Sequence, residues 1–270
     1  MAITTLQQAK DGLLPPILIS KGNANGVSTP TYRSLWFRAP NAGAFDSTLN
    51  GVTLTSAVGG FPFPEPASGK ETRIVGFRAR SGSTSMNGFF LFCDRLWHNG
   101  GIDITSTSAQ SITSPTWPPR DANEATDGDG VLLALELSVS AGAGTPTITV
   151  SYTNSNGVSG RTGTNITPTV ASPTAGSMLP ISLEGADRGV RSVQSVTLSS
   201  SWVSGTAHLV AYRPVMGAPA HGGPMFGSFS EDALTCGMPK VPNGATLYAV
   251  FASQENNNLL FGGSLSLAQG

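Results

Sequence analysis

Residues 131–163, VLLALELSVSAGAGTPTITVSYTNSNGVSGRTG, contain the pattern that decides the fold. Apolar residues alternate over 131–139 and again over 148–152, which is the period of a β-strand with one packed face. Asn156-Gly157 follows the second run, and this dipeptide favours the backbone of a tight hairpin turn. The stretch therefore predicts an antiparallel meander in which Glu136 lies on the solvent-facing side.

The composition of the whole chain agrees with many short strands joined by turns. Of the 270 residues, 33 are Gly, 19 are Pro and 11% are charged, against about 25% charged residues in an ordinary soluble domain. We therefore expect an all-β fold, an antiparallel, jelly-roll-like β-sandwich, with a division into two β subdomains as the alternative. The low charge indicates a surface that faces sister subunits in part, because free monomers normally need charge to stay soluble. A neutral, stand-alone β-sandwich is the other explanation.

The chain is expected to divide at its turn-rich segments. The predicted units are an N-terminal arm (1–30), a first β region (31–125) and a second β region (126–270) with a loop insertion at 214–242, and the two β regions can also form one continuous sandwich. In the arm, Thr5 and Gln8 have the spacing of a capping box, which predicts a short helix over 5–11. Pro15-Pro16 then favours extended chain, and we expect this arm to pack on the domain or on a neighbour.

Two of the predicted strands are apolar on both sides. Residues 87–97, NGFFLFCDRLW, place Phe90 and Phe92 opposite Leu91 and Cys93, and residues 246–253 alternate in the same way around Tyr248. Such strands are covered on one side by the core and on the other by a further layer or subunit. We interpret this pattern, together with the low charge, as burial between copies of the chain.

Charge, cysteine content and hydropathy exclude several classes of function. The formal net charge is −1, so the chain offers no basic field for nucleic acid. No apolar run approaches the ~20 residues of a membrane span, and the segment MAITTLQQAKDG lacks the features of a secretory signal. Cys93 and Cys236 do not make a disulfide framework. We expect no nucleic-acid partner, no membrane partner and folding in a cytoplasm.

The residues that commonly carry chemistry give weak signals. No nucleophile elbow, phosphate-binding loop or dinucleotide fingerprint occurs. The three histidines lack the short spacing of metal ligands; we expect His208 to be structural and His221 to be exposed. Asp127 and Asp129, in DGDG, are weak candidates for a cation site, although turn chemistry explains this loop equally well. We therefore expect no enzyme activity, no cofactor and no bound metal.

The tryptophans leave a carbohydrate-binding alternative open. A β-sandwich that binds or cleaves sugars would present exposed Trp or Tyr side chains beside carboxylates. Trp97 and Trp202 fall in apolar strand patterns and are more typical of core, so Trp117 is the residue whose exposure would favour this alternative.

Four strings resemble a group of tailed-bacteriophage virion structural proteins, capsid-associated and decoration-like. They are Asp94-Arg95-Leu96-Trp97, Arg120-Asp121-Ala122-Asn123, Tyr152-Thr153-Asn154 with Gly160-Arg161-Thr162, and the run from Gly189 to Leu198. The similarity covers roughly residues 30 to 214 and leaves the insertion at 214–242 outside it. The resemblance implies a virion component without fixing its place in the particle. From the low charge and the two-sided strands we expect a homo-oligomer, assembled in the host cytoplasm.

Within that class, the expected role is a capsid decoration or cement protein, or a minor capsid protein, that bridges subunits of the head. Its partners would be copies of itself and other virion proteins, above all the major capsid protein. A neck, tail or fibre-attachment protein is the alternative. The candidate residues for ion pairs at these interfaces are Arg78, Arg80, Arg161, Arg188 and Arg191; solvated surface arginines are the alternative interpretation.

Overall fold

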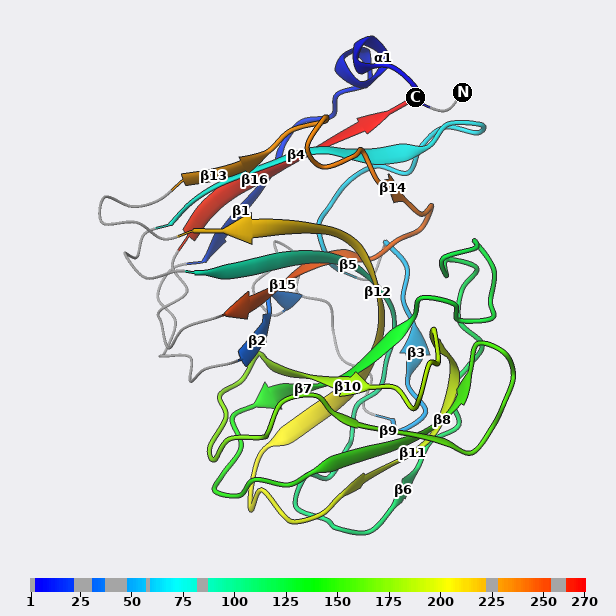
Figure 1. Ribbon diagram of the computed structural model, residues 1–270, viewed down its shortest axis with the longest axis vertical. Coiled ribbons are helices and arrows are strands. Elements are labelled where there is room, and N and C mark those ends of the chain that lie inside the picture. The colour runs from blue at the N-terminus through cyan, green and yellow to red at the C-terminus, as the bar shows by residue number, and fades with distance from the viewer. Residues whose placement is uncertain are drawn as a thin grey trace.

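The computed structural model describes residues 3–21, 31–36, 48–56, 59–81, 87–221, 228–253 and 261–270. Nearly all regular structure in these ranges is β, and every strand pairing is antiparallel, which confirms the all-β, sandwich-like class. The strands stack as a small sheet, a closed barrel and a second sheet (Figure 1). The pattern of apolar residues did not predict the barrel.

The barrel forms because six strands pair in a ring. Its strands, in spatial order, are β2 (Thr31–Ser34), β15 (Leu247–Ser253), β5 (Gly88–His98), β12 (Thr206–Ala220), β7 (Leu132–Val139) and β10 (Ser177–Ser182). Pairing of β10 with both β7 and β2 closes the ring, and β3 (Val52–Thr53) adds to β5. Closure removes exposed strand edges from the middle of the molecule.

A sheet lies on each side of the barrel. The small sheet contains β1 (Ile17–Lys21), β16 (Phe261–Gln269), β4 (Thr72–Ser81) and β13 (Ser228–Glu231), with β14 (Lys240–Val241) also paired to β4. The second sheet continues from the far end of β10 and contains β9 (Arg161–Asn165), β8 (Ile148–Asn154), β11 (Val190–Leu198) and β6 (Gln110–Ser111). Strands of the regions 31–125 and 126–270 share both the small sheet and the barrel.

The N-terminal segment joins the small sheet. Helix α1 (Leu6–Asp11) begins at Thr5 with the predicted capping box to Gln8 and ends at Gly12, so the short helix is confirmed. After the two prolines, β1 pairs along its length with β16. The extended stretch thus packs on the chain's own sheet, where Ile17 and Ile19 enter the core.

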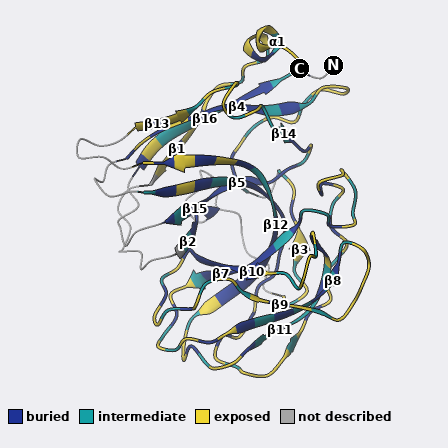
Figure 2. Cartoon of the chain, viewed as in Figure 1, coloured by how far each residue is buried: buried dark blue, intermediate teal, exposed yellow. Residues whose placement is uncertain are grey.

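Three apolar clusters fill the spaces between and inside the layers. The small sheet and the barrel enclose a cluster around Phe77, the barrel encloses Trp36 and Tyr248, and the barrel and the second sheet enclose a cluster around Leu135 and Val150. Barrel strands such as β5 and β15 therefore have an apolar cluster on each face (Figure 2). Phe90, Phe92 and Tyr248 are covered by the chain itself, which corrects their assignment to burial between copies.

Residues 131–163 fold in part as expected. Strands β8 and β9 form a hairpin around Gly157, although its turn spans residues 155–160 and is longer than a two-residue turn. The predicted meander is wrong for β7, which pairs with β10 and β12 and not with β8. Glu136 is buried and not solvated, because the interior of the barrel lies on that side of β7.

The prediction of a loop insertion at 214–242 is also wrong. Strand β12 continues to Ala220, and β13 and β14 follow within the same stretch. The pairing of β12 with β7 ends at Tyr212, and beyond this residue β12 pairs with β5 alone within the barrel. Pro214 and Pro219 are tolerated there because a strand with one neighbour does not need every N–H for a ladder.

Candidate interaction surface

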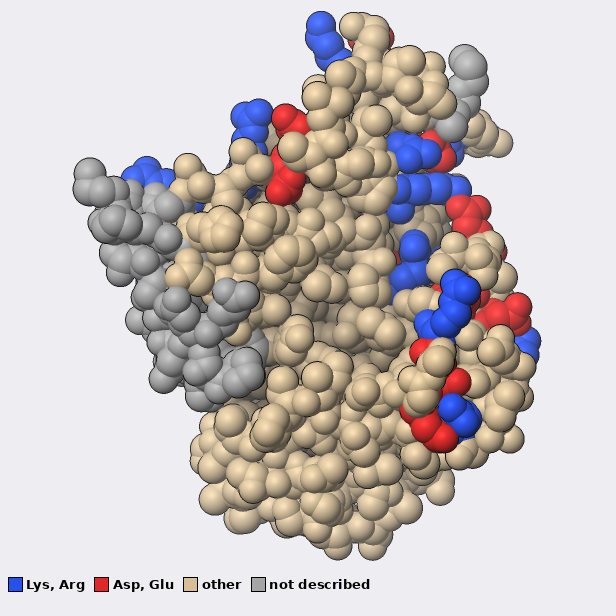
Figure 3. All heavy atoms as spheres, viewed as in Figure 1, with Lys and Arg blue, Asp and Glu red and all other residues tan. Residues whose placement is uncertain are grey.

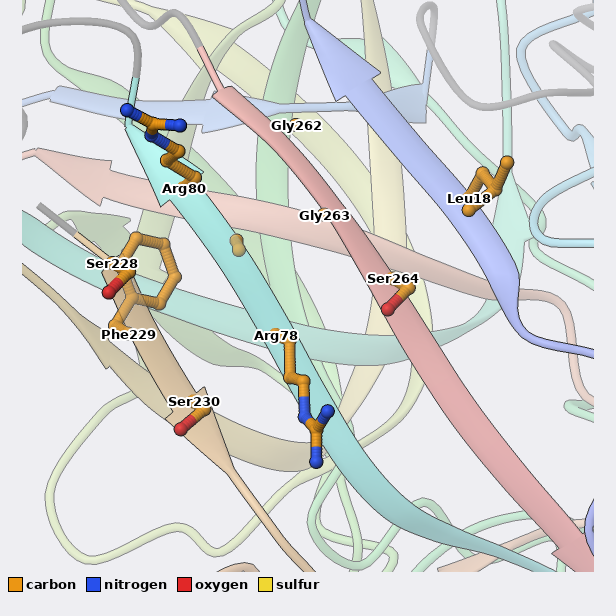
Figure 4. A pocket seen from close by; sticks show the side chains of 10 residues that line it. Leu18, Arg78, Arg80, Ser228, Phe229, Ser230, Gly262, Gly263 and Ser264 are labelled. Atoms are coloured by element: carbon orange, nitrogen blue, oxygen red, sulfur yellow. The ribbon is translucent and has the colours of Figure 1, made fainter. Parts of the chain in front are cut away.

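The outer face of the small sheet is an open surface at one end of the molecule. Along β4, Phe77 and Ala79 point into the core and alternate with Arg78 and Arg80, which are exposed on the opposite face. The period of two along a strand dictates this arrangement. The two predicted arginines thus share one face of one strand (Figure 4).

Small side chains surround these arginines and leave the surface shallow. We call this surface the outer face and define it by Leu18, Arg78, Arg80, Gly262, Ser264, Ser228 and Ser230. These residues line a hollow of about 530 Å³ that is open to solvent. Leu18, on the edge strand β1, is 74% exposed and supplies an apolar contact at this hollow. Arginine beside an exposed apolar residue is typical of protein–protein interfaces.

The other three predicted arginines have carboxylate partners within the chain. Arg161 contacts Asp187 at 2.9 Å and Glu184 at 3.0 Å, on the second sheet. Arg188 contacts Asp129 at 3.0 Å, and Arg191 contacts Asp127 at 2.5 Å. The structure therefore divides the predicted set: two arginines lie together on the outer face, and three hold loops of the second sheet.

These ion pairs also account for Asp127 and Asp129. Their loop is organised by Asp121, whose carboxylate accepts backbone N–H groups of Asn123, Ala125, Gly128 and Asp129. Each candidate carboxylate then faces an arginine, which is the arrangement of an ion pair. Among the described residues, no group of three or more His, Cys, Asp or Glu side chains is placed to hold a metal ion.

A buried polar core inside the barrel is a feature that the strand pattern did not reveal. Arg95 on β5 and Glu136 on β7 are both fully buried, and their Nη1 and Oε2 atoms lie 2.6 Å apart. The Arg95 guanidinium lies 4.4 Å from the Trp36 ring centroid and 5.6 Å from that of Tyr248. A buried ion pair of this kind constrains which strands meet, since a charge left without its partner inside the barrel is costly.

A second buried ion pair joins two distant parts of the chain. Arg120 contacts Asp94 at 3.1 Å and also donates to the backbone carbonyls of Leu54 and Gly244. Asp94 accepts from the backbone N–H of Thr246. Two of the strings that carry the sequence resemblance therefore contact one another in the interior. The sequence contained one signal for these buried ion pairs, the charged residues Asp94 and Arg95 within the apolar run FFLFCDRLW. Charged residues are buried almost only when they are paired.

Two histidines lie close together at the end of β5 and on β12. Burial lowers the pKa of His98 to about 2, with Arg95 and His208 acting in the same direction. Burial also lowers the pKa of His208 to about 4, although its Nδ1 lies 2.7 Å from the carbonyl of Asn99. His208 is structural, as predicted, and His221 is exposed, as predicted.

These histidines predict a loss of stability in mild acid. Because their folded pKa values lie below 6.5, the unfolded chain takes up protons first, and stability falls as the pH drops from 6.5 toward 4. Each histidine contributes about 1.4 kcal/mol per pH unit in that window. Denaturant titrations between pH 7 and pH 4.5 measure this slope. His208→Gln should reduce it by about half, and an unchanged slope would contradict the assignment.

The tryptophans do not supply the exposed aromatic side chains that the carbohydrate-binding alternative requires. Trp117, whose exposure would have favoured it, is buried and donates from Nε1 to the carbonyl of Val190 at 2.7 Å. Trp36, Trp97 and Trp202 are buried as well. No tryptophan side chain is therefore available on the surface to stack on a sugar ring.

The cysteines of the chain are both free thiols. Cys93 is buried inside the barrel, and Cys236 is half-buried beside the small sheet. Burial raises the pKa of the Cys93 thiol far above its ordinary range, so this thiol is protonated and unreactive. Within the described ranges, the chain has no helix with the length and apolar character needed to cross a bilayer.

Comparison with known proteins does not assign this chain to a family. No protein-family model matches the chain, and no curated protein matches it. Among solved structures, the chain is similar to "The 2.6A structure of Infectious Bursal Virus Derived T=1 Particles", at 10% identity, 96% coverage of this chain, 79% coverage of that chain and a TM-score of 0.18. It is also similar to the infectious bursal disease virus VP2 subviral particle, at 8% identity, 96% and 82% coverage and a TM-score of 0.19. TM-scores this low do not establish a shared fold.

Proposed function

We propose that this chain is a non-enzymatic structural component of a tailed-phage virion. Its role is that of a capsid decoration or cement protein, or a minor capsid protein, which stabilises the head by bridging subunits. The open outer face of the small sheet is the observation that carries this proposal. It is broad and shallow, and it combines Leu18 with Arg78 and Arg80, which suits docking on another protein more than enclosing a small molecule.

The residues that carry the sequence resemblance also support this proposal, because they lie in the part of the fold that holds the outer face in place. The strings around Asp94 and Arg120 meet in the buried ion pair, and the run from Gly189 to Leu198 forms β11. These residues lie in or beside the barrel and the second sheet, while the outer face lies on strands β1, β4, β13 and β16. A barrel held between two sheets is a rigid support for a docking surface of this kind.

The outer face suits a partner with acidic and apolar groups, such as the major capsid protein. Arg78 projects from the outer face of β4 and would meet a carboxylate, and Leu18 would fill an apolar depression. At the rim, backbone N–H groups of Thr235 and Leu234 lower the pKa of Asp232, with a contribution from Arg78, so this carboxylate is charged. Binding should therefore weaken as salt screens these charges.

Binding of the purified chain to isolated phage heads tests the proposal. Leu18→Asp and Arg78→Glu should each weaken binding at least about tenfold, which corresponds to about 1.4 kcal/mol. Both residues are exposed, so their replacement should leave the folded state intact. Co-sedimentation with heads at increasing salt measures the effect.

Arg188→Ala is the matched control for this experiment. Its side chain is 79% exposed, but it lies on the second sheet and away from the outer face. The control should bind like the unmodified chain. Failure of the unmodified chain to bind heads, with binding to isolated tails or necks instead, would move the protein to another part of the virion. Binding of Leu18→Asp with unchanged affinity would remove the outer face from the interface.

A further inference from the structure

Three loops at the far end of the barrel and second sheet form a second surface, which we call the uncharged platform. It comprises residues 139–147, 166–176 and 199–206. Its sequence is unusual, since residues 137–160, 162–183 and 192–212 contain no Asp, Glu, Lys or Arg. In Figure 3 this lower part of the molecule shows charged side chains at its right margin and none across the rest of the visible face.

Hydrogen bonds between the loops make the platform a single rigid unit. The backbone N–H of Ala141 donates to Pro173, and that of Gly142 donates to Ser204. Further along, Thr147 and Ser199 are joined by two hydrogen bonds, at 2.8 and 2.9 Å. Loops fixed to one another in this way lose little conformational entropy when they bind a partner.

Apolar side chains project from this rigid unit into solvent. Val139 is 54% exposed, Ile166 is 56% exposed and Val203 is 69% exposed. The remaining exposed side chains of the platform belong to Ser, Thr, Ala and Pro residues. Val139 pairs with Thr206, at the end of the turn that carries Val203, so these two apolar side chains lie on neighbouring loops of an uncharged surface, which suits contact with another protein.

Val203 gives an independent indication that the platform is a binding surface. Its φ is +69°, a conformation that a β-branched residue rarely adopts. The turn holds it there, because its N–H donates to Ser201 Oγ at 2.8 Å while Trp202 beside it is buried. Strained backbone of this kind occurs mainly where a site for another molecule is held in place. Here the result is an apolar side chain at the tip of an exposed turn.

We propose that the uncharged platform binds the same platform of a second copy of this chain. A charged partner surface would lose hydration here without meeting opposite charges, which favours an uncharged occupant. The platform meets that requirement, and a twofold axis would bring identical apolar tips together. The proposal deepens the proposed function, on which it rests: the outer face would hold the capsid, and the platform would join neighbouring copies.

Sedimentation equilibrium of the free chain tests this pairing without any capsid present. The unmodified chain should form dimers, and Val203→Asp should weaken the dimer at least tenfold. Aspartate tolerates this backbone conformation better than valine, so the variant should fold as well as the unmodified chain. Thermal unfolding of the variant at a concentration where both proteins are monomeric checks this point.

Val158→Asp is the matched control. Val158 is 51% exposed in the β8–β9 turn, outside the platform, so the same change of residue there should leave the dimer intact. A Val203→Asp variant that is monomeric but still binds heads would support the pairing and keep the two surfaces distinct. A monomeric unmodified chain, equal weakening by both variants, or loss of head binding in place of loss of dimers would overturn it. The last of these outcomes would assign the platform to the capsid.

Discussion

Replacing Glu136 with glutamine is expected to lower the free energy of unfolding by about 3–5 kcal/mol. Glu136 and Arg95 are fully buried inside the barrel with 2.6 Å between their charged atoms. Removing the carboxylate charge leaves the Arg95 guanidinium in a low-dielectric interior without its counter-charge. Urea titration with tryptophan fluorescence measures the loss, because Trp36 lies against that guanidinium.

A double variant and a surface pair distinguish this explanation from a general loss of packing. Arg95→Met combined with Glu136→Met removes both charges, and it should recover most of the stability that Glu136→Gln loses. Asp127→Asn, which breaks the exposed pair with Arg191, should change stability by less than about 1 kcal/mol. A Glu136→Gln protein as stable as the unmodified chain would show that the barrel does not depend on this ion pair.

Phe77→Ala is expected to cost a similar amount, about 3–5 kcal/mol, through a cavity between the small sheet and the barrel. The Phe77 ring lies on β4 and contacts Phe92 at 4.8 Å and Phe90 at 5.3 Å between ring centroids. Phe229 on β13 lies 5.8 Å from Phe77 and also stacks on Phe90. The aromatic group therefore joins three strands from two layers, and its loss should loosen the outer face as well.

Phe89→Ala provides the comparison for this variant. Phe89 is on the same strand as Phe90, but it is 40% exposed at the end of the barrel, so its loss should cost clearly less. Equilibrium unfolding of both variants measures the difference. Equal losses would contradict the assignment of Phe77 to the centre of the interlayer core.

Strand existence could be predicted from the sequence because a period of two is a local property. Residues 72–80, TRIVGFRAR, show such an alternation around Phe77, and in the structure Phe77 points inward while Arg78 and Arg80 point outward. The capping box at Thr5 and the hairpin around Gly157 are local for the same reason. Each of these features depends on residues that are close together in the chain.

Closure of the barrel could not be predicted in this way. It depends on the pairing of β10 with β2, between strands that are far apart in the sequence. That closure gives β7 a second buried face, and it converts Glu136 from an expected solvent-facing residue to a partner of Arg95. The apolar faces of β5 and β15 were identified correctly, but their cover is the chain's own layers.

Only the local part of the candidate surface could be predicted from the sequence. Arg78 and Arg80 lie on one strand, so their common direction follows from the alternation alone. Arg161, Arg188 and Arg191 have carboxylate partners that come together through the fold, which the residue types did not reveal. Leu18 belongs to the arm that was expected to pack on the domain or on a neighbour, and it is the exposed apolar residue of the outer face.

The central claim, that the chain is a structural part of a virion, is tested most directly by locating it in assembled particles. Immunogold electron microscopy with antibodies against the purified chain should label the heads of tailed-phage particles from the source of this sequence. Label distributed regularly over the head surface is the result that a decoration or cement protein predicts. Unlabelled particles, with the chain recovered entirely from the fraction that contains no particles, would contradict the claim.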